Sequence, residues 1–535
     1  MKNKELLQDL TVEDLVGQVL CYDIYDKDDP SEVERIIAKI KPGGIFVTGM
    51  TAEKIKMYTD MVNKYTKVPV IVTTDVENGP FTPIKDGIML PHPMAWGACN
   101  DEKLIEEAAE VTARICRKCG VHWSFSPCVD ILYNFQSPSM NIRAISDDPD
   151  AIIRLGGSYM RGLQKNGRMI ASCKHFPGDG WDDRNPHFLT TVNGLSKDEW
   201  LQTYGKVFKS MFEQGCISVM PGHISLPCVE DSNLVPEDCL PATLSYNVLT
   251  KLLKGELGFD GCVVSDAMSM LGACMVCDLN KLAVEFLRVG GDFVLFPEPT
   301  DYDCIHKAVK NGVLSLERLT DAVDRVLEMK KKVGLFESYE ETERLEELER
   351  TLERLAQEIA NKSIKVVRNF DDLIPIPKKK NGSILMLNIS EPFLKKDPTG
   401  EELKDFQRVF EENGYSVTSL DNPKHGKVGE IVDNYDFVLV NIKMSSQDYH
   451  GGTMRMGWNT INALWRGYAF KNKNVIVTSF GDPYKLYDMP YVREYINAFS
   501  FSPSSQRAVA NVILGNIEAK GKNPVSFGRY FSREI

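Results

Sequence analysis

The chain has 535 residues, more than one hydrophobic core ordinarily organises, so we expect two domains. It carries 75 Asp and Glu against 63 Lys and Arg, and the resulting formal charge of -12 argues against a nucleic-acid partner or an anionic membrane surface. No apolar run reaches the ~18 residues that a membrane span needs, and the first ten residues carry acidic side chains where a secretory leader needs a continuous apolar stretch.

The first part of the chain alternates short apolar runs with amphipathic stretches. The apolar runs predict strands at 17–22, 44–48, 69–74, 122–126, 169–173, 218–221, 262–265 and 293–296. Helices are predicted between them, among others at 102–118, 151–165, 197–214 and 247–256. Eight strand–helix units in succession predict a TIM-like (β/α)8 barrel, whose site is built from the carboxyl ends of the strands.

The rest of the chain has a different pattern. A charged, leucine-bearing run predicts a linker helix at 337–362. Beyond it, apolar strands at 383–388, 416–420, 437–442 and 474–479 alternate with helical patterns at 401–412, 460–468 and 503–514. The sequence therefore predicts an α/β protein with a barrel domain at 1–336, the linker helix, and a C-terminal α/β sandwich domain at 363–535.

The thirteen cysteines favour a reducing compartment. They are odd in number and lie inside apolar patterns, which fits thiols better than a disulfide framework, so we expect a cytoplasmic protein. Two Cys-x-x-Cys pairs occur, Cys116 with Cys119 and Cys274 with Cys277. Both lie in or beside predicted helices without a neighbouring His, so we interpret them as packed thiols rather than zinc ligands.

Polar side chains follow several predicted strands. Strand three ends at Asp75, strand five at Lys174 and His175, strand six at His223, and strand seven at Asp266. After Lys174-His175, a Phe-Pro-Gly sequence and a second Gly turn the chain into an exposed polar loop. Any one polar strand end is unremarkable, but four of them predict a site on one face of the barrel.

Two segments resemble family 3 of the glycoside hydrolases, and within it the β-N-acetylglucosaminidase branch. Residues 174–187 match Lys-His-Phe-Pro-Gly-(His or Asp)-Gly followed by a downstream histidine, and residues 258–268 carry Asp266 where the family has its nucleophilic Asp. The resemblance covers almost the whole chain. It implies a retaining exo-enzyme that removes β-linked N-acetylglucosamine from cell-wall or chitin-derived saccharides, without a metal or organic cofactor.

The resemblance also implies a role for each site residue. Asp266 is the expected nucleophile, which captures the anomeric carbon. His187 is the expected acid/base, a task that suits an imidazole because its ordinary pKa of ~6.5 lies near operating pH. The expected sugar-binding residues are Asp75, Arg143, Lys174 and His175. Without the match, we would interpret His187 as a surface histidine, Arg143 as an ion-pair partner of Asp147 or Asp148, and Asp75 as a helix cap.

The chain departs from the family beside the acid/base. The family usually has Asp two residues before this histidine, and here the residue is Asn185, whose amide oxygen can accept a hydrogen bond but adds no charge. We therefore expect weaker acid/base catalysis, unless Asp182 or Asp183 substitutes. Trp181 is expected to stack on a sugar or to clamp the loop, and His223 to support the site from behind the sugar-binding residues.

Three alternatives remain open on the sequence. Phosphate instead of water could attack the glycosyl-enzyme, because a histidine repels an incoming phosphate less than a carboxylate does. The sugar could be β-glucose or β-xylose. The chain could also be a catalytically weak sugar-binding protein, since Asn185 replaces the family's carboxylate. The partner is a carbohydrate in each case, and the sequence does not predict an oligomeric state.

Overall fold

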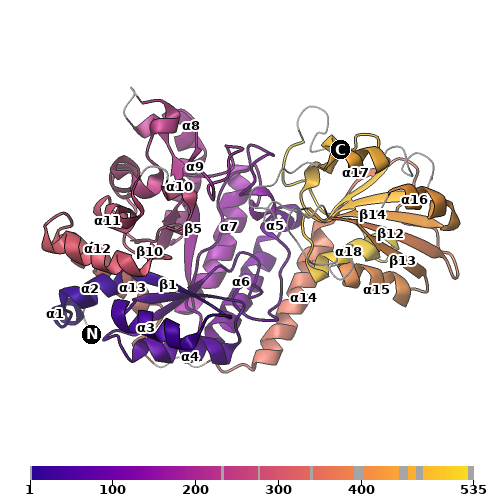
Figure 1. Cartoon of the computed structure of the whole chain (residues 1–535). Helices are drawn as coiled ribbons and strands as arrows, with labels where there is room; N and C mark the ends of the chain where they lie inside the picture. Colours follow the sequence, from indigo (N-terminus) through magenta and orange to yellow (C-terminus); the bar gives the residue numbers. More distant parts are fainter. Residues whose placement is uncertain are drawn as a thin grey trace. The chain divides into compact units, whose positions relative to one another are not determined.

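The computed structural model describes residues 3–230, 234–274, 277–337, 341–390, 403–423, 425–444, 456–464 and 474–527 (Figure 1). The chain divides into two compact units. The first comprises Met1–Ile88, Ile105–Ile131 and Ile152–Leu352, and the second comprises Met89–Leu104, Leu132–Ala151 and Glu353–Ile535. The domain boundaries that the sequence suggests stay predictions. In the described part of the chain, no helix has the length and apolar character needed to cross a membrane.

The first unit is built on an eight-stranded parallel sheet with the order β10-β1-β2-β3-β4-β5-β7-β9. A bridge between Val264 and Phe293 joins the two end strands, so the sheet closes on itself. The TIM-like (β/α)8 barrel predicted from the sequence is thereby confirmed. Its strands are β1 (Leu20–Tyr25), β2 (Gly44–Thr48), β3 (Ile71–Thr74), β4 (Trp123–Ser124), β5 (Ile170–Phe176), β7 (Ser218–Pro221), β9 (Cys262–Val263) and β10 (Val294–Leu295).

Helices cover the outside of this barrel (Figure 1). They include α2 (Val12–Gln18), α3 (Pro30–Ile40), α4 (Ala52–Asn63), α6 (Glu102–Lys118), α7 (Pro149–Gln164), α8 (Lys197–Gln202), α9 (Tyr204–Glu213), η6 (Asn247–Glu256), α11 (Leu279–Arg288), α12 (Pro299–Lys310) and α13 (Leu316–Lys332). A buried cluster fills the barrel with side chains from all eight strands, among them Phe46, Trp123 and Phe293. The Trp123 and Phe293 rings stack with centroids 5.4 Å apart.

Two barrel strands, β1 and β5, differ from their predicted bounds by three residues, and the other barrel strands differ by two residues or fewer. The strand predicted at 17–22 begins later, because Thr11 caps α2 in a reciprocal capping box with Asp14 and the helix runs to Gln18. The strand predicted at 169–173 instead continues to Phe176. The consequence matters for the site, because Lys174 and His175 lie within β5 and not in the loop after it.

The second unit is an α/β sandwich, as predicted. Its six-stranded sheet has the order β11-β16-β15-β14-β12-β13, with β11 antiparallel to β16 and the other pairs parallel. The strands are β11 (Lys365–Asn369), β12 (Ser383–Ile389), β13 (Ser416–Asp421), β14 (Phe437–Ile442), β15 (Val475–Ser479) and β16 (Glu494–Asn497). β11 and β16 were missed in the sequence, since their lysine, arginine, glutamate and asparagine residues interrupt the apolar pattern.

Two apolar clusters lie on opposite faces of this sheet. One includes side chains of α15 (Lys404–Glu412) and α18 (Pro503–Ile513), and the other includes Val428 of α16 (His425–Ile431). Figure 1 shows α15 and α18 on one side of the sheet and α16 and α17 (Trp458–Ala463) on the other. The helix predicted at 460–468 extends beyond the described residues after 464.

The charged run after the barrel forms α14 (Leu345–Ser363). Its apolar stripe is fully buried, because Leu348, Leu352, Leu355 and Ile359 are each 0% exposed. The helix is thus amphipathic and packs by this stripe, while its many glutamates and arginines occupy the remaining surface.

The closure of the barrel depends on a buried carboxylate, Asp292, which precedes β10 and is 0% exposed. Its Oδ2 accepts a hydrogen bond from the Val263 amide of β9 at 2.9 Å, and its Oδ1 lies 2.5 Å from Nη2 of Arg318. One side chain therefore joins the last two strands to α13.

The first prediction concerns this carboxylate. Asp292→Ala leaves the Val263 amide without its acceptor and removes the buried carboxylate that pairs with Arg318, so we expect a loss of about 3 kcal/mol in the stability of the barrel. Asp321→Ala is the matched control, because Asp321 also pairs with Arg318, at 2.6 Å, but its side chain is 50% exposed, and its loss should cost under about 1 kcal/mol. Denaturant unfolding followed by circular dichroism measures both, and equal unfolding midpoints contradict the prediction.

Candidate active site

The end of β5 places a buried cation beside the turn that follows β3. Lys174 is 4% exposed, and its Nζ lies 2.8 Å from Asp75 Oδ1 and 2.8 Å from Glu77 Oε1. Two carboxylates thus balance one ammonium group. The structure brings together the predicted residues Lys174 and Asp75 and adds Glu77, which the sequence analysis did not single out. Asp75 is the more exposed of the two carboxylates and leaves part of its surface open to a ligand.

His175 is held by Asp130, which is 0% exposed. The ring Nδ1 lies 2.8 Å from Asp130 Oδ2, and the same carboxylate accepts hydrogen bonds from the backbone amides of His175, at 3.1 Å, and Asp179, at 2.7 Å. Because an ionised carboxylate can only accept, Nδ1 carries the proton in this contact. Asp130 therefore fixes both the orientation of the ring and the start of the following loop.

Asp266 lies directly after β9 and is partly exposed. Its Oδ1 accepts a hydrogen bond from the Ala267 amide at 2.8 Å. Burial by itself would raise the pKa of this carboxyl, but His175, His223, the Ala267 amide and Lys174 favour the charged form, and the net pKa lies below its ordinary value. Asp266 is therefore an ionised carboxylate at neutral pH, which a nucleophile at this position requires.

His223 supports the backbone next to Asp266. Its Nε2 lies 3.0 Å from the Ala267 carbonyl, which can only accept, so Nε2 carries the proton and Nδ1 accepts from the Thr243 hydroxyl at 2.9 Å. Burial lowers the pKa of His223, partly offset by Asp266 and by the hydrogen bond to Ala267. The ring is therefore neutral near pH 7, and both of its nitrogens are used within the protein.

Asn185 holds His187 through its amide oxygen. Asn185 Oδ1 lies 2.7 Å from His187 Nδ1 and also accepts the His187 backbone amide at 3.0 Å. Asp182 does not substitute for the missing carboxylate, because it binds Arg184 Nε at 2.7 Å and the Val192 amide at 2.8 Å, contacts that lower its pKa despite partial burial. Asp183 is exposed on the same loop.

The loop that carries His187 is packed at both ends. At its start, Gly178 has φ +120° and an added Cβ would lie 2.0 Å from the Tyr204 ring, so glycine is required there. At its end, the Leu271 amide donates to the His187 carbonyl at 3.2 Å, which joins this loop to the segment after Asp266. The two predicted catalytic residues therefore belong to loops that contact one another.

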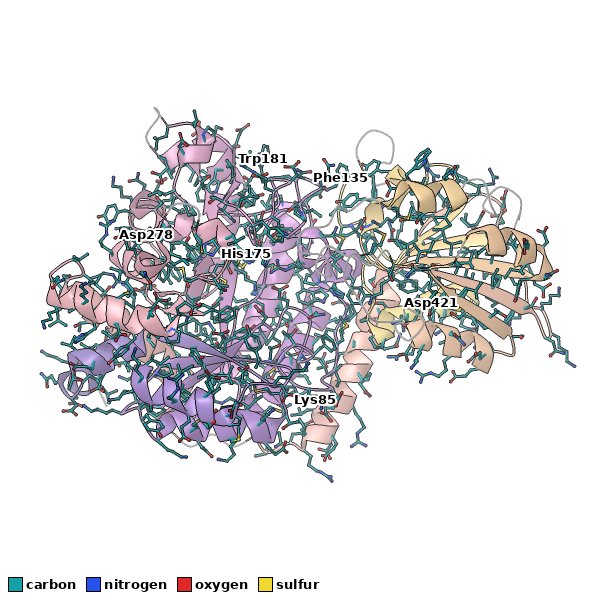
Figure 2. The ribbon with its side chains drawn as sticks, in the orientation of Figure 1. Lys85, Phe135, His175, Trp181, Asp278 and Asp421 are labelled. Atoms are coloured by element: carbon teal, nitrogen blue, oxygen red, sulfur yellow. The ribbon has the colours of Figure 1, made fainter. Side chains whose placement is uncertain are left out.

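Two further predicted residues lie apart from this network. Trp181 is 40% exposed (Figure 2), and its indole lies beside Gly194, which follows β6 (Thr191–Val192). Arg143 belongs to the second compact unit, at the end of a short 3-10 helix, where Nη1 donates to the Ser139 carbonyl at 2.8 Å. Their contacts with a sugar stay predictions.

Sequence reasoning missed the residues that position the predicted ones. Asp130, Glu77 and Thr243 touch His175, Lys174 and His223 respectively. A signal existed for Asp130, because it follows β4 and polar residues after barrel strands belong to the site. Thr243 lies twenty positions from His223 with no local pattern to mark it.

The chain is similar to known proteins in sequence. The sequence model described as "Glycosyl hydrolase family 3 N terminal domain" matches residues 11–329. A Cellulomonas fimi protein named beta-N-acetylglucosaminidase/beta-glucosidase is 28% identical over 97% of this chain and 94% of its own length.

Solved structures are similar over both units. A beta-glucoside phosphorylase, BglX, bound to 2FGlc superposes with a TM-score of 0.87 at 28% identity, over 98% of this chain and 96% of its own. A family 3 beta-N-acetylglucosaminidase from Paenibacillus sp. str. FPU-7 superposes with a TM-score of 0.82 at 25% identity, over 97% and 99%. Since the family match alone spans more than half of the sequence, the chain belongs to family 3 of the glycosyl hydrolases.

Proposed function

We propose that this protein is a retaining exo-glycosidase that removes β-linked N-acetylglucosamine from cell-wall or chitin-derived saccharides. The observation that carries the proposal is the ionised Asp266 beside Lys174 and His175, on a loop that contacts the one bearing His187. The sugar is suggested by the names of the Cellulomonas fimi and Paenibacillus relatives. The thiol state of all thirteen cysteines, every one of which lies among the described residues, favours a cytoplasmic location.

In the first step, Asp266 attacks the anomeric carbon while His187, protonated on both nitrogens, gives its Nε2 proton to the leaving oxygen. The glycosidic C–O bond breaks, and an ester bond forms between the sugar and Asp266. In both steps, His187 Nδ1–H donates a hydrogen bond to Asn185 Oδ1. Nε2 is therefore the nitrogen that gives up and takes back a proton.

In the second step, the neutral His187 takes a proton from the acceptor at Nε2, and the acceptor oxygen displaces Asp266 from the anomeric carbon. Lys174 and the Ala267 amide stabilise the carboxylate of Asp266 as it leaves. Lys174, His175 and Asp75 bind the sugar hydroxyls, and Arg143 is a further sugar contact carried over from the family pattern.

Phosphorolysis is a second candidate, in which phosphate is the acceptor. Two observations favour it: the similar structure of BglX is that of a beta-glucoside phosphorylase, and the acid/base pair of His187 and Asn185 carries no negative charge that would repel phosphate. The names of BglX and of the Cellulomonas fimi relative both include a β-glucoside activity, so a β-glucoside is included among the substrates to be assayed.

The second prediction tests the proposed roles. With nitrophenyl β-N-acetylglucosaminide, we expect Asp266→Asn to lose about 1,000-fold or more in turnover, because no other group can form the ester. His187→Ala should lose about 100-fold or more on substrates with poor leaving groups, and added azide should restore glycosyl transfer as the glycosyl azide. A His187→Ala enzyme as active as wild type, or activity on no sugar in a panel that includes β-glucoside and β-xyloside, contradicts the proposal.

The third prediction concerns Asn185. Asn185→Asp places a carboxylate against the Nδ1 proton of His187 and stabilises the imidazolium, so we expect higher turnover on poor leaving groups and an alkaline limb of the pH–kcat profile displaced to higher pH. Asp183→Asn is the matched control, since this exposed carboxylate lies on the same loop. An unchanged alkaline limb in Asn185→Asp contradicts the role given to this contact.

The fourth prediction separates the two acceptors. If phosphate is the acceptor, inorganic phosphate should raise turnover of an unactivated disaccharide about 10-fold or more in wild type and yield sugar 1-phosphate, because a bound dianion outcompetes water at the glycosyl-enzyme. Asn185→Asp should reduce this phosphate stimulation, since the new carboxylate repels the dianion. Free sugar as the sole product at saturating phosphate assigns hydrolysis and excludes phosphorolysis.

A further inference from the structure

Three buried side chains of different chemistry converge beside the sugar-binding residues. The ligand atoms of Cys128, Asp130 and His175 all lie within 4.8 Å of one another, and the residues are 2%, 0% and 7% exposed. In the part of the chain that the structure describes, this is the one group of three or more His, Cys, Asp or Glu side chains that could together hold a metal ion. The Cys-x-x-Cys pairs noticed in the sequence do not form such a group.

The backbone fixes these side chains in place. Cys128 pairs with Lys174 in a parallel bridge, in which the Val129 amide donates to the Lys174 carbonyl at 2.8 Å and the Lys174 amide to the Pro127 carbonyl at 3.2 Å. This bridge sets Cys128 next to β5. The carboxylate of Asp130 is oriented independently by the backbone amides of His175 and Asp179. Little conformational entropy is therefore lost when an ion binds.

The set of donors selects a class of ion. A thiolate, an imidazole nitrogen and a carboxylate oxygen are ligands of zinc and similar borderline ions, whereas magnesium and calcium require oxygen alone. Metal–nitrogen and metal–oxygen bonds of about 2 Å at a tetrahedral angle put the two ligand atoms about 3.3 Å apart. His175 Nδ1 and Asp130 Oδ2 are 2.8 Å apart, so a shift of about half an ångström admits the ion between these two atoms, and Cys128 Sγ, within 4.8 Å of both, completes the site by moving toward it.

We propose that Cys128, Asp130 and His175 bind a zinc-type divalent cation and that the bound ion inhibits the enzyme. Three protein ligands leave a fourth coordination position for water. Binding releases the thiol proton of Cys128 to solvent. The Nδ1 proton of His175 is also released, Nε2 takes up a proton from solvent in its place, and the hydrogen bond between His175 and Asp130 is replaced by one bond from each side chain to the metal. The His175 imidazole, which interacts with Asp266, thereby changes its orientation and its tautomer, while Lys174 keeps its carboxylate partners.

The inhibitory part of this inference rests on the proposed function, but the binding part does not. A spectroscopic signal of the ion therefore tests the site even if the chain cleaves no glycoside. Cobalt(II) is a suitable probe, because it takes the same ligands as zinc and a thiolate–cobalt bond gives a charge-transfer band in the near ultraviolet.

The fifth prediction compares wild type, Cys128→Ser and Cys119→Ser, each with cobalt(II) or zinc(II) alone. Cys119→Ser is the matched control, because Cys119 directly follows α6 and is about as buried as Cys128. We expect the charge-transfer band in wild type and Cys119→Ser and not in Cys128→Ser. Zinc affinity by calorimetry should fall about 100-fold or more in Cys128→Ser, since loss of even an outer-shell partner costs about 10–100-fold. Zinc should inhibit wild type and Cys119→Ser at concentrations that leave Cys128→Ser active.

Three results overturn the inference: no thiolate band in wild type, a band that persists in Cys128→Ser, or a band that disappears in Cys119→Ser instead. Binding without inhibition of a demonstrably active wild type overturns the inhibitory role. If Cys128→Ser fails to fold, zinc-edge X-ray absorption of the wild-type complex decides, because the site requires one sulfur scatterer with nitrogen and oxygen. A spectrum with no sulfur scatterer, or with two or more, rejects the proposed site.

Discussion

The site depends on a series of backbone hydrogen bonds across the carboxyl ends of four neighbouring strands. The segment after β4 donates to Lys174, Gly222 after β7 donates to the Phe176 carbonyl at 2.9 Å, and Asp266 after β9 donates to the Pro221 carbonyl at 3.3 Å. These bonds fix the separation of residues that lie far apart in the sequence. Because the barrel is closed, none of these strands is an edge that can slip relative to its neighbour.

Electrostatic balance is the second constraint on the site. The Lys174 ammonium group is buried between two carboxylates, and its charge also contributes to the lowered pKa of Asp266, which is partly exposed and ionised. A buried cation of this kind would be costly without its partners. The carboxylates that balance Lys174 therefore leave the proposed nucleophile, Asp266, in its charged form.

The proposed acid/base, His187, has an uncharged partner, whereas Asp266 has a charged neighbour in Lys174. His187 is oriented by the neutral Asn185, and His223 is neutral and fully used within the protein. Lys174 thus contributes positive charge near the proposed nucleophile Asp266, while the uncharged Asn185 amide holds the His187 imidazole. Because no negative charge lies on Asn185, neither water nor phosphate is repelled as it approaches His187. A carboxylate at position 185 would repel phosphate and so favour water.

The sequence by itself determined the element types, all eight barrel strands and most strands of the sandwich, because apolar runs and amphipathic periods are local properties. It also identified the candidate site residues at the strand ends, because Lys174, His175, His223 and Asp266 follow apolar runs in the sequence. Tertiary structure alone decided which side chains orient them. Asp130 reaches His175 over forty-five positions and Cys128 joins both, because parallel strands bring distant segments together without any local pattern in the sequence.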